Sequence, residues 1–276
     1  MKRSLAVALA AGCFGLLGGH AVPAGPQAGI ERLYVLYCGE GTAGDISLWS
    51  PKVDVGKPME LSVSCYLIKH GQGWLLWDTG VADSVFAMPQ GLKPRNPRMT
   101  TYRRTKTLAA QLDQLGLRPS DIKYVAISHA HPDHVGNLAM FPQSTILVQR
   151  AEYDWPTPFG RTLQAAASPV SKLDGDRDVF GDGSVMLIAT PGHTPGHQSL
   201  LVKLPNAGAL LLSGDAVHFK SNWDNRRVPE LNFDRDKTVA SMQRIADILR
   251  SERAQLWINH DKAQSDGLRM SPNFYD

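Results

Sequence analysis

The sequence predicts an α/β domain in which several strands end at one rim and carry a metal site on the loops that follow. The first observation is the apolar run Tyr124–Ile127, which ends abruptly in a polar stretch, residues 129–134, rich in metal-ligating side chains. The second is that similar strand ends recur along the chain, immediately before His193, Asp215 and His260. Loops that follow strands at a common rim lie close together, so these side chains are expected to meet.

Residues 1–21 are predicted to be a secretion signal. Lys2-Arg3 forms a basic start, and the apolar stretch Leu5–Leu17 is too short to span a bilayer comfortably. Gly19-His20-Ala21 has small residues at the two positions that a signal peptidase reads, which favours cleavage after Ala21. The mature protein is therefore expected to be exported, either to the periplasm or to the medium.

Behind the signal, residues 22–29 are rich in Pro, Gly and Ala and are predicted to be a flexible tether. Residues 30–276 then form a single domain of ordinary size. A lipoprotein anchored through Cys13 is a lesser alternative, because the expected aliphatic residue three positions before it is missing.

The charge balance argues against a nucleic acid partner. The whole chain carries a formal charge of +3, and removal of Lys2 and Arg3 leaves 27 basic against 26 acidic residues. No basic stripe remains to hold nucleic acid. No later segment is long and apolar enough for stable membrane insertion after signal cleavage. The oligomeric state is left open, a homodimer included.

The first half of the domain reads as strands with one helix. Expected strands are Arg32–Cys38, Leu61–Lys69 and Trp74–Trp77, the last two forming a hairpin whose turn holds a solvated His70. Residues 39–57 are expected to be a loop, and residues 83–100 a lid, a pocket wall or plain surface loop. A helix is expected over Thr101–Leu115, with a stripe of leucines and a stop at Gly116.

The second half alternates hairpins and short helices. After the strand at Tyr124–Ile127 come a short helix at Val135–Met140, a strand at Thr145–Gln149, a helical turn at Arg150–Trp155 and a loop or broken helix over 156–176. The remaining expectations are hairpins at 178–189 and 198–213, a helix from Asp234 to about Arg250, and a last strand at Gln255–Ile258.

Two cysteines remain after processing, Cys38 and Cys65. In an oxidising compartment they could pair. Both lie in apolar runs, so two buried free thiols are an equal alternative. Their spacing differs from that of a metal-binding knuckle.

The cluster at 129–134 is best explained by a metal ion. The imidazoles of His129, His131 and His134 and the carboxylate of Asp133 would crowd their polar groups if buried without partners. Zinc suits imidazole and carboxylate ligands together. The matching residues downstream argue against a chance His-rich turn.

In these motifs and their order, the chain resembles the metallo-β-lactamase superfamily. His-Ala-His-Pro-Asp-His at 129–134, Pro-Gly-His-Thr-Pro-Gly-His at 191–197, Gly-Asp at 214–215 and His260 follow the order of that superfamily. The resemblance implies an αββα sandwich with a dinuclear metal site at one edge of the sheets. It implies two divalent metal ions, with Zn²⁺ as the first expectation and Fe, Co or Mn as alternatives.

The resemblance also implies a role for each ligand. The first metal would be held by His129, His131 and His193, the second by Asp133, His134 and His260, and Asp215 would bridge both. Asp78 would steer an imidazole from behind the ligands, and His197 would be a structural hydrogen-bonding residue.

Within the superfamily, the chain is most similar to the N-acyl-homoserine lactonases. The similarity is carried by the segments at 32–35, 65–68, 148–153 and 191–200. Those lactonases commonly have a tyrosine three residues after the bridging aspartate, and this chain has His218 there. His218 is expected either to contact the substrate or to be a loop histidine without a catalytic part.

The implied activity is hydrolysis of a cyclic carboxylic ester, an N-acyl homoserine lactone in the first instance, which amounts to quorum quenching. A metal-bridging hydroxide would attack the carbonyl carbon. Asp133 would carry a proton to the leaving alkoxide, and His218 would steady the oxyanion. The acyl chain would need an apolar groove. Four residues could line it, although each could equally belong to the hydrophobic core: Trp49, Phe86, Met88 and Met99.

Two alternatives remain. One is another hydrolase on the same ligands, acting as a β-lactamase, a thioesterase or a different esterase or lactonase. The other is a non-catalytic periplasmic metal-binding protein, which the complete ligand set makes the weaker alternative.

Overall fold

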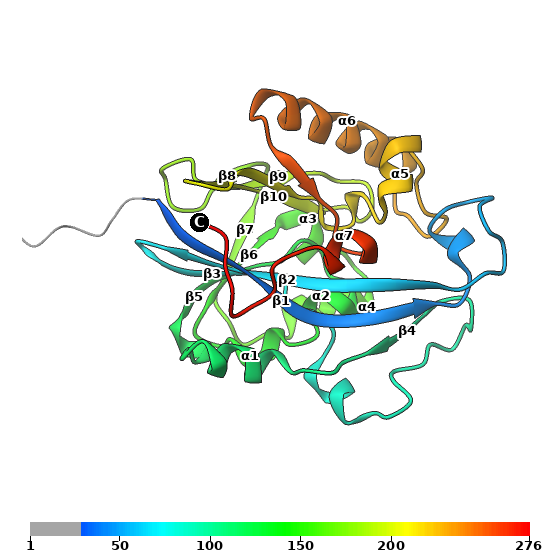
Figure 1. Cartoon of the computed structure of the whole chain (residues 1–276), viewed down its shortest axis with the longest axis horizontal. Helices are drawn as coiled ribbons and strands as arrows, with labels where there is room; N and C mark the ends of the chain where they lie inside the picture. Colours follow the sequence, from blue (N-terminus) through cyan, green and yellow to red (C-terminus); the bar gives the residue numbers. More distant parts are fainter. Residues whose placement is uncertain (1–28) are drawn as a thin grey trace, which may run out of the picture.

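Two β-sheets packed face to face form the centre of the protein (Figure 1). The computed structural model describes residues 29–276. The seven-stranded sheet has the order β4-β1-β2-β3-β5-β6-β7. Its strands, in chain order, are β1 (Ile30–Ala43), β2 (Met59–His70), β3 (Gly73–Trp77), β4 (Thr100–Arg103), β5 (Ile122–Ala126), β6 (Thr145–Gln149) and β7 (Val170–Leu173). The five-stranded sheet has the order β12-β11-β10-β9-β8, with β8 (Arg177–Asp178), β9 (Val185–Ala189), β10 (Gln198–Leu204), β11 (Gly208–Leu212) and β12 (Gln255–Trp257).

Helices lie on the outer faces of both sheets, as Figure 1 shows for α1 on one side and α6 on the other. The helices are α1 (Leu108–Gln114), α2 (Pro132–Val135), α3 (Arg150–Tyr153), α4 (Pro158–Gln164), α5 (Lys220–Asn225), α6 (Arg235–Ser251) and α7 (Lys262–Asp266). Short 3-10 helices occur at Ile46–Leu48, Asp83–Ala87, Pro119–Asp121, Leu138–Met140 and Gly214–Ala216. The layer order helix, sheet, sheet, helix confirms the predicted αββα sandwich.

The strand β1 shows how the sequence builds these layers. Successive side chains of a strand point to opposite faces. Leu33 and Val35 therefore pack between the two sheets, whereas Tyr34 and Leu36 pack toward α1. Because both faces are covered there, the middle of the strand, residues 33–38, is continuously apolar instead of alternating. A separate core forms where Ile245 of α6 packs on the five-stranded sheet.

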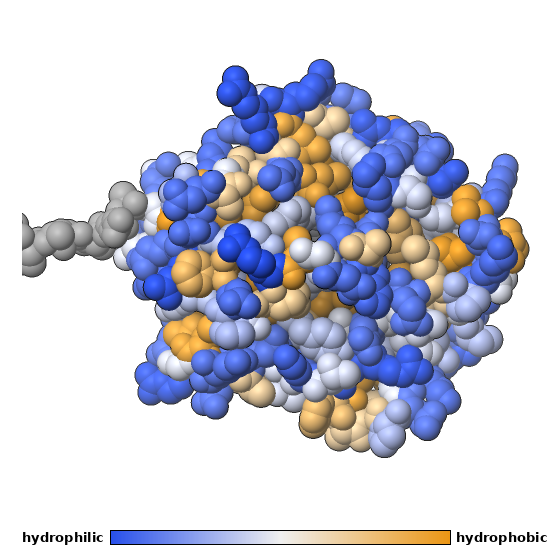
Figure 2. All heavy atoms as spheres, viewed as in Figure 1, coloured by the Kyte–Doolittle hydropathy of each residue, from blue (hydrophilic) through white to orange (hydrophobic). Residues whose placement is uncertain are grey.

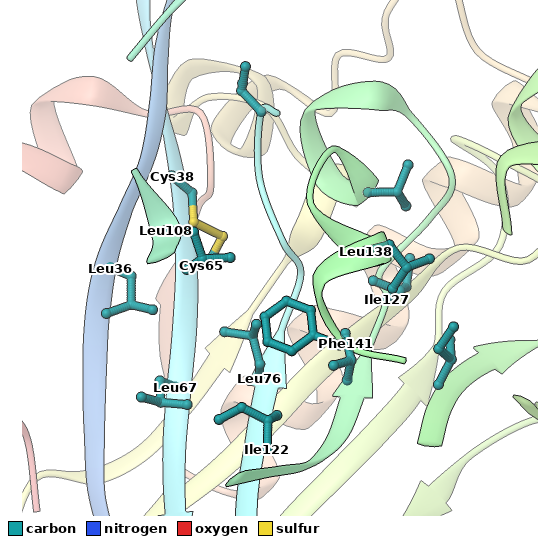
Figure 3. Packing of buried hydrophobic residues seen from close by; sticks show 14 of the residues in the cluster. Leu36, Cys38, Cys65, Leu67, Leu76, Leu108, Ile122, Ile127, Leu138 and Phe141 are labelled. Carbon is teal, nitrogen blue, oxygen red and sulfur yellow. A yellow bond between two sulfur atoms is a disulfide. The ribbon is translucent and has the colours of Figure 1, made fainter. Parts of the chain in front are cut away.

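The two cysteines that could have been free thiols form a disulfide. Cys38 of β1 and Cys65 of β2 are bonded, with a Cα–Cα distance of 5.6 Å. Figure 3 shows the bond among the buried side chains of Leu36, Leu67 and Leu76. The disulfide joins neighbouring strands close to where they approach the rim that carries the candidate site.

The helix expected from Thr101 is wrong in its first half. Residues Thr100–Arg103 form β4, which pairs antiparallel with the end of β1. The strand β1 reaches Ala43, beyond the predicted strand end, and its last residues pair with both β2 and β4. The helix begins only after Thr107, whose hydroxyl accepts a hydrogen bond from the Ala110 N–H. A four-residue edge strand forms because a partner strand lies beside it in space, and the periodicity of the local sequence gives no information about that partner.

His70 is a second correction. It was expected to be solvated in the hairpin turn, but its side chain is fully buried. The imidazole stacks on Phe180 with ring centroids 3.9 Å apart, and its Nε2 lies 2.9 Å from Asp182 Oδ2. The hairpin of the other sheet covers this turn, which explains the burial.

Other differences concern short elements. Of the helix expected at 135–140, Val135 is the last residue of α2 and Leu138–Met140 form a separate 3-10 turn. The stretch 156–176 contains the helix α4, in line with the expected broken helix, but also the strand β7, which was not predicted. The strand β7 forms by parallel pairing with β6, with Ile146 opposite Val170. The helices α5 and α7 were not predicted. The expected signal at 1–21 and nearly all of the tether at 22–29 lie outside the described residues.

The surface carries no large continuous apolar face in the view of Figure 2, where hydrophilic side chains surround smaller apolar areas. Among residues 29–276, no helix combines the length and the apolar character needed to cross a bilayer.

Candidate metal centre

The four predicted strand ends meet at one rim. The loops that follow β5, β9, β11 and β12 bring together every residue predicted to be a metal ligand, in two groups. One group is His129, His131, His193 and Asp215, and the other is Asp133, His134 and His260. Within each group, one ligand atom from each residue lies within 4.8 Å of the others.

In the first group the nitrogens face one another across a small space. His129 Nε2 lies 2.9 Å from His131 Nδ1, and His193 Nε2 lies 3.1 Å from the same atom. Asp215 Oδ2 completes the group at 3.7 Å from His129 Nε2 and 3.6 Å from His193 Nε2.

The second group lies on the other side of Asp215. Asp133 Oδ2 is 3.8 Å from His134 Nε2 and 3.6 Å from His260 Nε2. Asp215 Oδ1 is 3.4 Å from His134 Nε2, while its Oδ2 is 3.2 Å from His260 Nε2. The two oxygens of Asp215 thus contact both groups, as a bridging carboxylate requires.

These distances fit a divalent metal ion in each group. Ligand atoms at the corners of a tetrahedron with metal bonds of 2.0–2.1 Å are about 3.3 Å apart. The observed separations, from 2.9 to 3.8 Å, bracket that value. Within residues 29–276, His134 Nε2 and Asp215 Oδ1 are buried without a hydrogen-bond partner, which a bound cation would supply.

The electrostatics of the first group favour neutral imidazoles. Burial, followed by repulsion from neighbouring histidines, lowers the pKa of His129 and His193 well below the ordinary value. Burial also lowers the pKa of His131 to about 4. All three are therefore neutral at neutral pH and keep a lone pair for a metal.

The second group is richer in negative charge. Burial opposes protonation of His134, but the carboxylates, led by Asp215, outweigh it and raise its pKa well above the ordinary value. The pKa of His260 is also raised, against burial, by the charge and the hydrogen bond of Asp215. Burial opposes ionisation of Asp215, yet the imidazoles, led by His260, hold its pKa well below the ordinary value. A cation that binds here competes with protons for these two imidazoles.

Asp78 fixes the orientation of one ligand. Its Oδ2 lies 2.8 Å from His134 Nδ1, and its two oxygens also accept hydrogen bonds from the N–H and hydroxyl of Ser128, both at 2.7 Å. Asp78 has φ +58°, an uncommon conformation for a residue other than glycine. With Nδ1 held from behind, Nε2 of His134 faces the cluster, as predicted for Asp78.

His197 also matches its prediction. It is fully buried, its Nε2 accepts a hydrogen bond from the Asp215 N–H at 2.9 Å, and its Nδ1 lies 2.9 Å from Thr190 Oγ1. It thus holds the loop that carries Asp215. A side chain at Gly214 would collide with this imidazole, since a Cβ there would lie 2.7 Å from His197 Nε2.

Glu152 was not singled out in the sequence, although it joins two of the ligand loops. It is fully buried, and its carboxylate accepts hydrogen bonds from the N–H of Ala130 at 2.8 Å and of Gly196 at 3.0 Å. The loops carrying His131 and His193 are thereby held at a fixed separation. An acidic residue three positions after the end of a buried strand was the available signal.

His218 lies among the ligands. Its Nε2 is 3.2 Å from Asp215 Oδ2, and its ring lies between those of His193 and His260, with centroids 5.0 and 5.5 Å away. The side chain is buried yet lines the cavity above the cluster.

Tyr102 is a second residue that the sequence did not indicate. Its hydroxyl donates a hydrogen bond of 2.8 Å to Asp133 Oδ2. Burial, followed by the negative charge of Asp133, raises the pKa of the phenol well above the ordinary value, so the hydroxyl keeps its proton.

A cavity of about 820 Å³ opens above the cluster. Its floor contains His131, Asp133, His193, Asp215, His218 and His260. Its walls are mainly apolar and include Leu48, Trp49, Leu61, Met99, Trp155 and Phe159. Of the four residues predicted for an apolar groove, Trp49 and Met99 therefore line it. Phe86 and Met88 do not line it and are largely exposed, because their 3-10 turn faces outward.

Comparison with known proteins agrees with this geometry. Residues 58–250 match the family model of the metallo-beta-lactamase superfamily. The chain is 33% identical over 236 residues to an N-acyl homoserine lactonase of Azorhizobium caulinodans, covering 80% of this chain and 90% of that protein. It is 32% identical over 258 residues to an N-acyl homoserine lactonase of a Bacillus species, covering 89% and 99%.

Solved structures give the same result. An N-acyl homoserine lactone hydrolase with the product N-hexanoyl-L-homoserine bound at its catalytic metal center superposes with a TM-score of 0.80 at 29% identity, over 89% of this chain and 99% of that chain. A dizinc quorum-quenching lactonase shares the fold, with a TM-score of 0.64 at 18% identity, over 91% and 97%. The chain belongs to the metallo-β-lactamase superfamily and, within it, to the family of the N-acyl homoserine lactonases.

Proposed function

We propose that this protein is a metal-dependent hydrolase that opens the lactone ring of N-acyl homoserine lactones, a quorum-quenching activity. The observation that carries the proposal is a complete ligand set for two cations on the floor of an apolar-walled cavity. The relatives named as N-acyl homoserine lactonases support the same substrate class.

The proposed cofactor is a pair of zinc ions. His129, His131 and His193 would hold the first, Asp133, His134 and His260 the second, and Asp215 would bridge them. When bound, two divalent cations supply an activated water and polarise the substrate carbonyl. Nitrogen and oxygen ligands of this kind suit zinc, and they also accept iron, cobalt or manganese.

Two residues of the cavity floor are assigned to the reaction. Asp133 would carry the proton released by the attacking water to the ring oxygen as that oxygen leaves the carbonyl carbon. His218 would donate a hydrogen bond from its imidazole to the carbonyl oxygen, on which negative charge develops. Both side chains line the cavity, so a bound lactone can reach them.

The walls of the cavity suit the rest of the substrate. An acyl chain loses contact with water when it lies along Leu48, Trp49 and Phe159, and its burial contributes about 0.8 kcal/mol for each methylene. The polar floor and the apolar walls therefore match the two parts of an acylated lactone.

We also propose that the protein acts outside the cytoplasm. The signal-like features of residues 1–21 support export. The disulfide between Cys38 and Cys65 supports an oxidising compartment, the periplasm or the medium.

A substrate panel tests the proposed activity. Purified, zinc-loaded mature protein is given an N-acyl homoserine lactone, nitrocefin and a thioester, and lactone opening is followed as proton release in weak buffer. The expected result is rapid lactone opening that a chelator abolishes. Cleavage of nitrocefin or the thioester without lactone opening would replace the lactonase with another hydrolase on the same site. Stoichiometric metal without any hydrolysis would favour a metal-binding protein.

A further inference from the structure

The structure assigns a positioning role to Tyr102, a residue outside both ligand groups: its hydroxyl holds the carboxylate of Asp133 in place for the second metal ion. This inference rests on the proposed function, because it concerns a residue of the same site.

The contact between the two residues is direct. The Tyr102 hydroxyl donates to Asp133 Oδ2 at 2.8 Å, and in residues 29–276 it is the one hydrogen-bond donor on that carboxylate. The same Oδ2 atom faces His134 Nε2 at 3.8 Å and His260 Nε2 at 3.6 Å. The phenol thus contacts the oxygen that points into the second group.

The other ligands of the cluster show why this donor is needed. His134 is held from behind by Asp78, and Asp215 is held through its backbone by His197. Asp133 lies in the short helix α2, and among residues 29–276 no group of that helix donates a hydrogen bond to its carboxylate. A carboxylate free to rotate about its side-chain bonds loses entropy when it binds a metal, and a fixed donor removes part of that cost.

The backbone around Tyr102 is built to hold its ring. On one side β4 pairs with β1, with Tyr102 opposite Gly41, and on the other Tyr102 exchanges two backbone hydrogen bonds with Leu92, at 2.8 and 3.1 Å. Gly41 leaves room for the ring, because a Cβ there would lie 3.3 Å from a ring carbon of Tyr102 and only 2.4 Å from Thr100 Cγ2. A residue anchored on both sides keeps its hydroxyl at a constant place.

Zinc affinity tests the inference without using the enzyme's substrate. The variants are Tyr102→Phe, Asp133→Ala and the double variant, each in the full mature chain, with zinc binding measured by competition with a chromophoric chelator. Tyr102→Phe is expected to weaken the more weakly bound zinc about tenfold, as loss of a hydrogen bond behind a metal ligand typically does. In the Asp133→Ala background, the same change should have no further effect.

A matched control is available on the neighbouring strand. Tyr37 of β1 is half-buried, and its hydroxyl accepts a hydrogen bond from the Thr105 N–H. Among residues 29–276, this hydroxyl makes no hydrogen bond to a ligand of the cluster. Tyr37→Phe therefore removes a phenol hydroxyl of the same sheet edge and should leave zinc affinity unchanged. With saturating zinc, Tyr102→Phe should lower kcat about tenfold and leave KM within about twofold.

Two results would overturn the inference. Zinc affinity of Tyr102→Phe equal to that of Tyr37→Phe would mean that the hydroxyl does not support the metal. An equal loss of affinity with and without the Asp133 carboxylate would mean that Tyr102 acts through general packing. Because zinc binding needs no lactone, a protein inactive on lactones that still shows the coupling would disprove the proposed substrate and keep the role of Tyr102.

Discussion

The Oδ2 atom of Asp78 lies 2.8 Å from Nδ1 of His134, behind the second group of ligands. The opposite nitrogen, Nε2, is buried without a hydrogen-bond partner among the described residues and faces Asp133 and Asp215. A carboxylate behind an imidazole fixes its tautomer and its direction, so the sandwich fold presents this ligand already oriented.

Removal of that carboxylate should weaken metal binding. For Asp78→Asn we expect a loss of zinc affinity of 10-fold to 100-fold, roughly the usual effect of changing a partner behind a metal ligand. Zinc retained after dialysis against a graded chelator series measures it. Asp247→Asn, an exposed change on α6, is the control and should behave as the native protein. Equal retention by both variants would show that His134 is oriented without Asp78.

His218 should affect turnover if it contacts the substrate. For His218→Phe we expect kcat to fall about 100-fold, because an oxyanion donor is lost, while zinc content is retained. Steady-state lactone hydrolysis and metal analysis of the same sample measure the two quantities. Turnover equal to that of the native protein would make His218 a loop histidine without a catalytic part.

The disulfide should contribute measurable stability. It closes a loop with a sequence separation of 27 residues, so Cys38→Ala/Cys65→Ala should lower the free energy of unfolding by about 2–4 kcal/mol. Urea unfolding followed by circular dichroism measures the change. A reductant should destabilise the native protein and leave the double variant unaffected, and a reductant effect on both would contradict the assignment to this bond.

Acid should weaken the fold through His197. Burial lowers the pKa of His197 to about 3 in the folded protein, against about 6.5 when unfolded. As pH falls below about 6.5, the unfolded chain binds a proton that the folded chain does not, so stability declines until about pH 3. In His197→Gln, the free energy of unfolding should fall less steeply with decreasing pH, by up to about 1.4 kcal/mol per pH unit. Urea unfolding of the metal-free protein at several pH values measures this slope. Identical slopes would show that His197 does not titrate in this way.

The clustering of the candidate ligands could be predicted because the information for it is local. His129, His131, Asp133 and His134 lie within six residues, and the remaining ligands each follow an apolar strand. Because each of these residues follows the end of a strand, the sequence also predicted that their loops meet at one rim, and in the structure they do. Core strands were found for the same reason, since each is a continuous apolar run with clear ends.

What was missed depends on partners far away in the chain. Tyr102 contacts Asp133 from β4, a strand that exists through its pairing with β1. The role of Glu152 depends on the hydrogen bonds that its carboxylate accepts from the backbone N–H groups of Ala130 and Gly196. His70 appeared solvated because its cover, Phe180 and Asp182, lies more than a hundred residues later. Sequence spacing does not contain these long-range contacts.

The most direct test of the dinuclear site is the metal content and activity of Asp215→Asn beside the native protein. The native chain is expected to hold two divalent ions, and the variant is expected to lose both metal and lactone-opening activity, because this carboxylate contacts both groups of ligands. His129→Ala should lose both properties in the same way. Full lactone opening by a variant whose site holds no metal would contradict a role of the two metal ions in the reaction.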